Sequence, residues 1–188
     1  MIIAVDLDNT INDFAKAWLA ILNKRHKLRV GYSELQNYEM EKNFPTLTPV
    51  QVDSVLGSPK FWYAAMKPQP ESVNILKHLS IHHEIYIVTA RAWHQHQAAI
   101  MWAKLWLPFI PEHHIIFAQN KDMIKCDVLI DDCPANLVRD DCATIQFIQP
   151  WNDEHKWGTY ACETWNEIYS LISGLDEGGL YPGRTNRS

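Results

Sequence analysis

Short apolar runs alternate along this chain with segments whose apolar residues recur at helical spacing. The runs are rich in β-branched residues, and they predict strands at residues 2–5, 84–88, 114–117, 128–130 and 144–148. Several of them are continuously apolar, which is typical of strands that are buried on both faces of a parallel sheet.

The segments between these runs predict helices, because their apolar residues recur at i, i+3, i+4 and i+7. Val73, Leu76 and Leu79 share one face of residues 72–79, and the same spacing recurs at residues 95–107 and 165–172. Alternating strands and helices indicate an α/β fold, a doubly wound, Rossmann-like parallel sheet of five strands.

One interval breaks the alternation. Residues 14–70 contain no convincing buried strand; they begin with a helical stripe that includes Phe14 and Trp18 and continue through a polar stretch with several prolines. This length exceeds an ordinary crossover, so we expect a small, mostly helical cap inserted after the first strand. The predicted core is residues 1–13 and 71–173, and the Gly-rich residues 174–188 are expected to form a loosely ordered tail.

Composition narrows the class of protein. The chain has 188 residues, of which 47% are hydrophobic, so it can bury a real core. Its net charge of -5 argues against an extended nucleic-acid surface. The four cysteines form no CxxC pair, no apolar run resembles a secretory leader, and none is long enough to span a bilayer, so we expect a cytoplasmic protein with reduced thiols. The seven glycines form neither a P-loop nor a dinucleotide fingerprint.

The candidate chemistry begins directly after the first predicted strand, where Asp6 and Asp8 lie two residues apart. Two carboxylates at a buried strand end repel each other unless a cation or hydrogen-bond donors lie between them. Either residue could instead belong to an ordinary loop or helix cap. A divalent metal and a phosphate ester explain the pair better.

Three further groups of polar residues follow predicted strands: Thr89-Ala90-Arg91, Lys121 and Asp131-Asp132. The carboxyl ends of parallel strands meet at one edge of a sheet, so these groups are expected to lie together with Asp6 and Asp8. Several carboxylates suit Mg²⁺, one carboxylate can attack phosphorus, and a second can transfer protons. The hydroxyl, the backbone and the ammonium can bind phosphoryl oxygens.

In this order, Asp6-x-Asp8-x-Thr10, Thr89, Lys121 and Asp131-Asp132 resemble the four motifs of the haloacid dehalogenase superfamily of phosphohydrolases. The resemblance implies that Asp6 is the nucleophile and Asp8 the general acid/base, and that Thr89, Ala90 and Lys121 bind phosphate. It also implies a Mg²⁺ site formed by Asp6, Asp8 and the Asp131-Asp132 pair, in which the residue matching Asp8 usually binds through its backbone carbonyl. Which residue of the pair binds the metal directly stays open.

Nearly the whole chain is similar to the 5′(3′)-deoxyribonucleotidases within that superfamily. The segments that carry this similarity are Asp13-Phe14, residues 58–62 and 66–70, Asn120-Lys121-Asp122 and residues 127–134. The similarity implies that Phe14, Phe61 and Trp62 help to form a nucleoside pocket. Two departures adjoin the motifs: Asn9-Thr10 stands where the family commonly has Gly-Val, and Ala90-Arg91 where it commonly has Ser-Pro. Arg91 is a further candidate substrate contact.

Structural alternatives exist for several of these residues. Thr89 could be a helix cap, Lys121 could be solvated like its neighbour Lys125, and Phe61 and Trp62 could be core residues in a chain with eight tryptophans. Several histidines are close neighbours in the sequence, but they lack a third ligand for a metal site. They are therefore expected at the surface or at helix ends.

The expected activity is Mg²⁺-dependent hydrolysis of (deoxy)ribonucleoside monophosphates through an aspartyl-phosphate. The alternatives are the same chemistry on another small phosphate ester, such as a sugar phosphate, or a nucleotide-binding module without catalysis. The expected partner is a small phosphate monoester, not a membrane or a polynucleotide, and a homodimer is compatible with the sequence.

Overall fold

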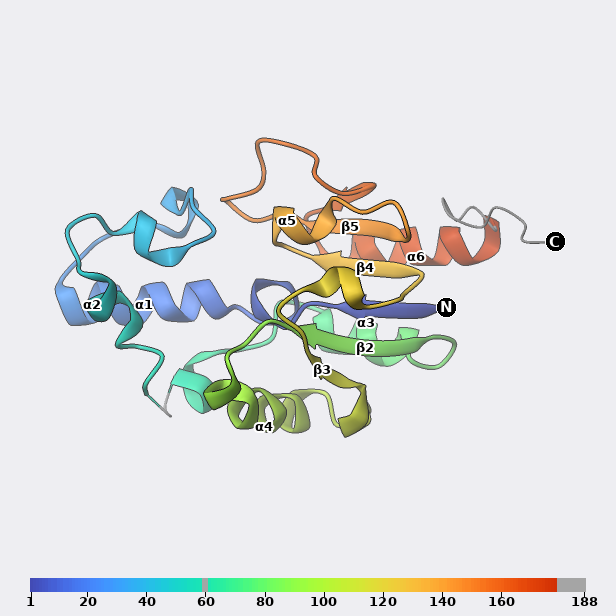
Figure 1. Ribbon diagram of the computed structural model, residues 1–188, viewed down its shortest axis with the longest axis horizontal. Helices are drawn as coiled ribbons and strands as arrows, with labels where there is room; N and C mark the ends of the chain where they lie inside the picture. The colour runs from blue at the N-terminus through green and yellow to red at the C-terminus, as the bar shows by residue number, and fades with distance from the viewer. Residues whose placement is uncertain (59–60, 179–188) are drawn as a thin grey trace.

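A six-stranded parallel sheet forms the centre of the computed structural model, which describes residues 1–58 and 61–178 (Figure 1). The strand order is β3-β2-β1-β4-β5-β6, and every pair is parallel. The strands are β1 (Ile2–Val5), β2 (Glu84–Thr89), β3 (Ile115–Phe117), β4 (Val128–Asp131), β5 (Ala143–Phe147) and β6 (Tyr160–Cys162). The predicted doubly wound α/β fold is confirmed.

The first strand can lie at the middle of the sheet because all of its side chains are apolar. Ile3, Ala4 and Val5 are all fully buried, and the strand pairs with β2 on one side and β4 on the other. The sequence predicted five strands; the sixth, β6, was missed. Its three residues, Tyr-Ala-Cys, form an edge strand that carries no continuous apolar run.

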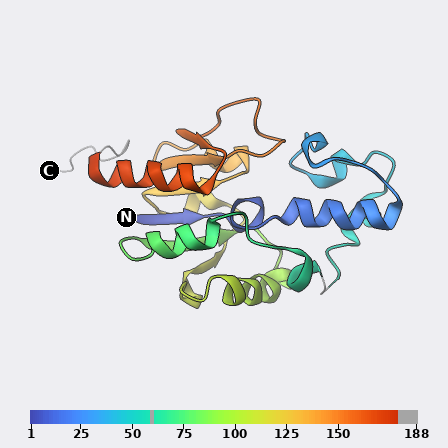
Figure 2. The same cartoon turned by 180° about the vertical axis from the view of Figure 1, so that it is seen from behind.

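Helices cover both faces of the sheet. They are α1 (Phe14–His26), α2 (Pro49–Asp53), α3 (Ser72–Leu79), α4 (His96–Trp106), α5 (Pro134–Leu137) and α6 (Trp165–Gly178). Figure 2 shows α3 and α6 side by side against one face. In α3, Leu76 and Leu79 of the predicted face are buried, Val73 is half-buried, and Ile75 is buried beside them.

The long segment after β1 extends beyond the carboxyl ends of the strands (Figure 1). Its helix α1 ends at His26, and the capping residue Lys27 adopts a left-handed conformation. The Trp18 indole donates a 2.9 Å hydrogen bond to the carbonyl of Val52 and so ties α1 to α2. Thr48 and Gln51 cap α2 reciprocally, with Pro49 at the first helical position. The division into core and cap at residues 14–70 stays a prediction.

The chain's last predicted boundary differs from the structure. Helix α6 continues through residue 174 to Gly178, and Leu175 is buried. The rest of the predicted tail, residues 179–188, lies outside the described residues, as do Pro59 and Lys60. No described helix combines the length and apolar character needed to cross a membrane.

Candidate active site

The loop that leaves β1 turns sharply and holds its two carboxylates apart. Asp6 continues the sheet, since its N–H donates to the carbonyl of Ile130 over 2.8 Å. Asn9 then adopts a φ of 62°, a conformation that glycine reaches freely and that asparagine tolerates better than most residues. The Asn9 side chain accepts a 2.7 Å hydrogen bond from the N–H of Ala15, so it also fixes the start of α1. Asparagine can therefore replace the glycine that the resembling family commonly has here.

Lys121 lies at the centre of the carboxylates. It belongs to η7 (Lys121–Met123), and its side chain is 1% exposed. Its ammonium donates to Asp6 Oδ1 and, over 2.7 Å, to Asp131 Oδ2. Arg139 holds the Lys121 loop from outside by donating to the carbonyls of Lys121 and Ile124. Lys125, the neighbouring lysine, is exposed.

Asp131 and Asp132 differ in how their oxygens are used. Asp131 ends β4 and accepts from the N–H of Cys133, from Asn136 Nδ2 at 3.0 Å and from Lys121. Asp132 Oδ1 accepts from the Thr10 hydroxyl at 3.4 Å. Its Oδ2 is buried and has no hydrogen-bond partner among the described residues. Asp132 thus has one buried carboxylate oxygen left for a ligand.

These carboxylates form a group that could hold a metal ion. Ligand oxygens of Asp6, Asp131 and Asp132 lie within 4.8 Å of one another. Burial, together with the nearby Asp131 and Asp8, raises the pKa of Asp6 to about 7, although Lys121 opposes the shift. Burial and the charges of Asp6 and Asp131 also raise the pKa of Asp132. One ammonium therefore does not balance three buried carboxylates, and a divalent cation fits the cluster.

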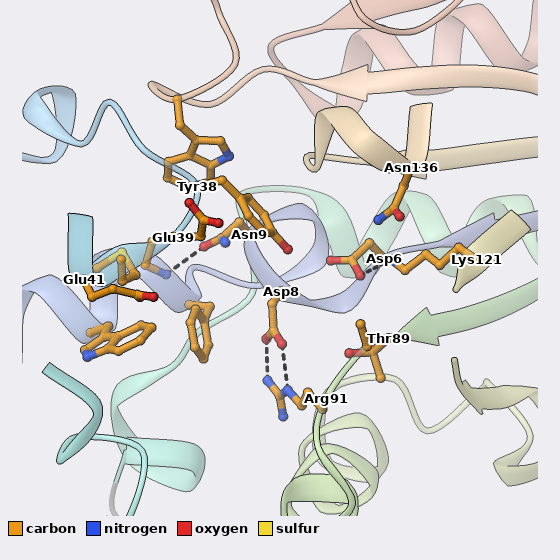
Figure 3. Close-up of a pocket in the computed structure, with 16 residues that line it drawn as sticks. Asp6, Asp8, Asn9, Tyr38, Glu39, Glu41, Thr89, Arg91, Lys121 and Asn136 are labelled. Atoms are coloured by element: carbon orange, nitrogen blue, oxygen red, sulfur yellow. Dashed lines mark hydrogen bonds and ion pairs between the residues drawn. The ribbon is translucent and has the colours of Figure 1, made fainter. Parts of the chain in front are cut away.

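Asp8 points away from that cluster, toward Arg91 (Figure 3). The guanidinium donates from Nε to Asp8 Oδ2 over 2.7 Å and from Nη2 to Asp8 Oδ1. Asn12 Nδ2 donates to the same Oδ1 over 2.9 Å. The side chain of Asp8 therefore lies outside the three-carboxylate group, and its predicted role in metal binding concerns the backbone carbonyl.

A cavity of about 250 Å³ opens between the strand ends and the segment after β1. Thr89 and Ala90, at the end of β2, line it together with Asp6, Asp8 and Lys121. Across the cavity from Lys121, Figure 3 shows Tyr38, Glu39 and Glu41, and these residues also line it. A polar end at the strand ends thus adjoins a second end formed by the segment after β1.

The aromatic residues predicted for the nucleoside pocket occupy two positions. Phe14 lines the cavity, and so does Trp18, which was not predicted for this pocket; their ring centroids are 5.2 Å apart. Phe61 is fully buried and Trp62 is 5% exposed. Both pack behind Phe14, at centroid distances of 5.4 and 6.0 Å, rather than lining the cavity that the described residues form. Phe14 and Trp18 therefore form an aromatic wall of the cavity, and Phe61 and Trp62 pack behind this wall.

Several residues at the site were not found from the sequence. Asn12 binds Asp8, Asn136 binds Asp131, and Tyr38 and Trp151 line the cavity. Asn12 and Asn136 follow the motif carboxylates within a few residues, but an uncharged loop residue has no sequence pattern that marks it as part of a site. Tyr38 and Trp151 meet only through the fold, and their ring centroids are 6.5 Å apart.

The arrangement can perform phosphoryl transfer. It combines a buried carboxylate able to attack phosphorus, a second carboxylate able to transfer a proton, a buried ammonium and a hydroxyl at one edge of a parallel sheet. The adjoining aromatic wall provides a surface on which a planar group can stack.

Comparison with known proteins supports the resemblance to deoxyribonucleotidases. Residues 1–176 match the profile of the family described as 5′ nucleotidase, deoxy (pyrimidine), cytosolic type C protein. The 5′(3′)-deoxyribonucleotidase of Clostridium acetobutylicum is 30% identical over 135 residues, covering 72% of this chain and 74% of that protein. The 5′(3′)-deoxyribonucleotidase of Bacillus subtilis is 26% identical over 155 residues, covering 80% and 87%.

Solved structures show the same fold at low identity. A haloacid dehalogenase-like hydrolase of Streptococcus pneumoniae superposes with a TM-score of 0.62 at 14% identity, covering 91% of this chain and 97% of its own. The haloacid dehalogenase hydrolase YfnB of Bacillus subtilis, described as bound to magnesium, gives a TM-score of 0.54 at 14% identity, covering 92% and 98%.

Proposed function

This chain belongs to the family of cytosolic type C 5′ deoxynucleotidases, within the haloacid dehalogenase superfamily of phosphatases, and on that premise we propose that it hydrolyses deoxyribonucleoside monophosphates to nucleoside and inorganic phosphate. The observation that carries the proposal is the cavity that joins the buried Asp6–Lys121–Asp131 cluster to an aromatic wall. We further propose that the reaction depends on Mg²⁺, passes through an aspartyl-phosphate and takes place in the cytosol.

In the first step, Asp6 attacks phosphorus while the bond between phosphorus and the ester oxygen breaks. Asp8 gives its proton to that oxygen, so the products are a nucleoside hydroxyl and an aspartyl-phosphate. In the second step, water attacks phosphorus, Asp8 takes a proton from the water, and the bond to Asp6 breaks. Inorganic phosphate leaves, and both carboxyl groups return to their starting forms.

The other polar groups serve the phosphoryl group. Lys121 offsets the negative charge of Asp6 and of the phosphoryl oxygens, and Thr89 and the Ala90 backbone hold those oxygens. A bound Mg²⁺ would supply further charge stabilisation, held by Asp6 and the Asp131-Asp132 pair. Asp132 is the better direct ligand of that pair, because its Oδ2 has no donor among the described residues, whereas both oxygens of Asp131 already accept hydrogen bonds.

The aromatic wall supports the nucleoside part of the proposal. A base can stack on Phe14 or Trp18, and stacking tolerates different bases because each has a π-face. Glu41, at the far end of the cavity, would repel a second phosphate there, whereas Glu39 is paired with Lys42. A mononucleotide therefore suits the cavity better than a nucleoside diphosphate does.

The test of the mechanism is the variant Asp6→Asn, with Asp140→Asn as a matched control at an exposed position. We expect Asp6→Asn to lose Mg²⁺-dependent phosphate release from deoxynucleotides by at least about 1000-fold, because an amide cannot act as the nucleophile. Asp140→Asn should retain wild-type turnover. Retention of most activity by Asp6→Asn would overturn the mechanism, and turnover of sugar phosphates at the same rate as nucleotides would overturn the substrate class.

A further inference from the structure

Arg91 is the one arginine whose guanidinium faces a carboxylate of the proposed catalytic pair, within the part of the chain that the structure describes. The side chain follows β2, is 3% exposed, and makes two parallel hydrogen bonds to Asp8. Such a bidentate pair fixes orientation as well as contributing energy. Asp8 is consequently held in one rotameric arrangement at the mouth of the phosphate end.

The donors around Asp8 are distributed unequally between its two oxygens. Oδ1 accepts from Arg91 Nη2 and from Asn12 Nδ2, which uses both of its lone pairs. Oδ2 accepts only from Arg91 Nε among the described residues. One lone pair of Oδ2 is thus left to carry a proton, whereas Oδ1 has none. Asn12 is itself fixed, since its side-chain oxygen accepts from the N–H groups of Asn9 and Phe14.

The guanidinium cannot easily leave this position. It lies over the ring of Trp62, 4.3 Å from the ring centroid, and its Nη2 also contacts the sulfur of Met66. The Trp62 indole is held in turn by a 2.9 Å hydrogen bond to the carbonyl of Leu56. Trp62 and Met66 come from the segment that leads back from the cap, so this segment fixes Arg91 and, through it, Asp8.

The same contacts argue against direct recognition of substrate by Arg91. Its Nε and Nη2 are used by Asp8, and its remaining nitrogen, Nη1, is buried without a hydrogen-bond partner among the described residues. Other atoms of Arg91 line the cavity, but Nη1 is buried and does not face a ligand in this arrangement. The sequence-based expectation of a substrate contact is therefore less consistent with this geometry than a role through Asp8.

We propose that Arg91 is a positioning residue for Asp8: with Asn12, it presents Oδ2 as the oxygen that gives a proton to the leaving group and later takes one from water. This inference rests on the proposed function. Ala90-Arg91 departs from the family pattern, and we infer that this departure affects proton transfer rather than phosphate binding.

The test compares Arg91→Met and Arg91→Lys on two phosphate esters whose leaving groups differ in their need for a proton. The departing alkoxide of a deoxynucleotide requires one, whereas 4-nitrophenolate leaves without one. Because kcat/KM reports the steps up to departure of the leaving group, it isolates proton donation from the later attack of water. Exposed Arg29→Met is the matched control, and thermal unfolding checks that each variant is folded.

For Arg91→Met, kcat/KM with deoxynucleotides should fall about 100-fold, whereas kcat/KM with 4-nitrophenyl phosphate should change by less than about threefold. For Arg91→Lys, kcat/KM with deoxynucleotides should lie between the values of Arg91→Met and wild type, because an ammonium keeps the charge but cannot make the two parallel hydrogen bonds. The inhibition constants of inorganic phosphate and of the deoxynucleoside product should stay within about threefold of wild type.

Two results would overturn the inference. Equal losses with both esters would indicate a general structural role, and an inhibition constant that rises as much as kcat/KM falls would indicate a direct substrate contact. If Arg91→Met does not fold, the same comparison is made with Arg91→Lys. A wild-type chain that hydrolyses neither ester overturns the proposed function as well, whereas active wild type with unaffected variants overturns the role of Arg91 alone.

Discussion

Replacing Lys121 with methionine removes the positive charge from the carboxylate cluster while keeping most of the side chain's apolar length. Lys121 Nζ lies 2.7 Å from Asp131 Oδ2 and also donates to Asp6. The side chain is 1% exposed, so water cannot replace the lost donor. We therefore expect Lys121→Met to destabilise the folded chain in the absence of divalent metal.

The expected size follows from three contributions. Opposite unit charges 2.7 Å apart attract by about 6 kcal/mol at an effective dielectric constant of about 20. Part of this is offset, because the folded variant no longer buries an ammonium. Asp6, whose pKa is already raised to about 7, can also take up a proton and limit the repulsion. A loss of about 3–5 kcal/mol remains, as is typical when one partner of a buried ion pair is removed.

Urea unfolding at neutral pH in EDTA measures this loss, and Lys125→Met is the matched control. Lys125 is exposed in the same loop, so its replacement should change the free energy of unfolding by less than about 0.5 kcal/mol. Excess MgCl₂ should recover part of the stability of Lys121→Met, because a cation that binds only the folded state stabilises it. A loss below about 1 kcal/mol, or no difference from the control, would refute this account of the cluster's charge balance.

Three further predictions concern packing and binding. Gly158→Ala should lower the free energy of unfolding by about 1–3 kcal/mol, because a Cβ there would lie 3.0 Å from the carbonyl oxygen of Thr144. Gly174 has open space around it, so Gly174→Ala should stabilise α6 slightly. Equal unfolding curves for the two variants would contradict this. Ser72→Ala should cost about 1 kcal/mol in the same assay, because the buried Ser72 hydroxyl donates its one proton to the carbonyl of Ile11 or of Gln69, which lie 3.0 and 2.9 Å away; an unchanged midpoint would show that this bond contributes nothing. Phe14→Ala should raise the inhibition constant of a deoxynucleoside about 10-fold and leave that of inorganic phosphate unchanged; equal shifts in both would exclude stacking on Phe14.

The strand ends were the part of the site that the sequence could predict. Asp6, Thr89, Lys121 and Asp131 each follow a recognisable apolar run, and parallel pairing brings such ends together whatever lies between them. Their proposed roles in catalysis and metal binding stay predictions. The fold class followed from the same alternation, except for the short edge strand β6.

Other parts depended on contacts between distant segments. Arg91 meets Asp8 across 83 positions of sequence, and no local pattern specifies whether a buried arginine faces a carboxylate or a ligand. The sequence does not distinguish the eight tryptophans from one another, but their environments differ. Trp18 lines the cavity, whereas Trp62 lies behind it. Which aromatic residue faces a ligand is decided by how the segment after β1 packs, and periodicity cannot show this.

The most direct measurement is the rate of phosphate release from a panel of phosphate monoesters with Mg²⁺ and with EDTA. The panel contains the common deoxyribonucleotides, the corresponding ribonucleotides and several sugar phosphates. We expect rapid release from deoxynucleotides with Mg²⁺, slower release from sugar phosphates, which lack a base to stack on the aromatic wall, and none in EDTA. Undiminished rates in EDTA, equal rates on sugar phosphates, or nucleotide binding without turnover would contradict the proposed function.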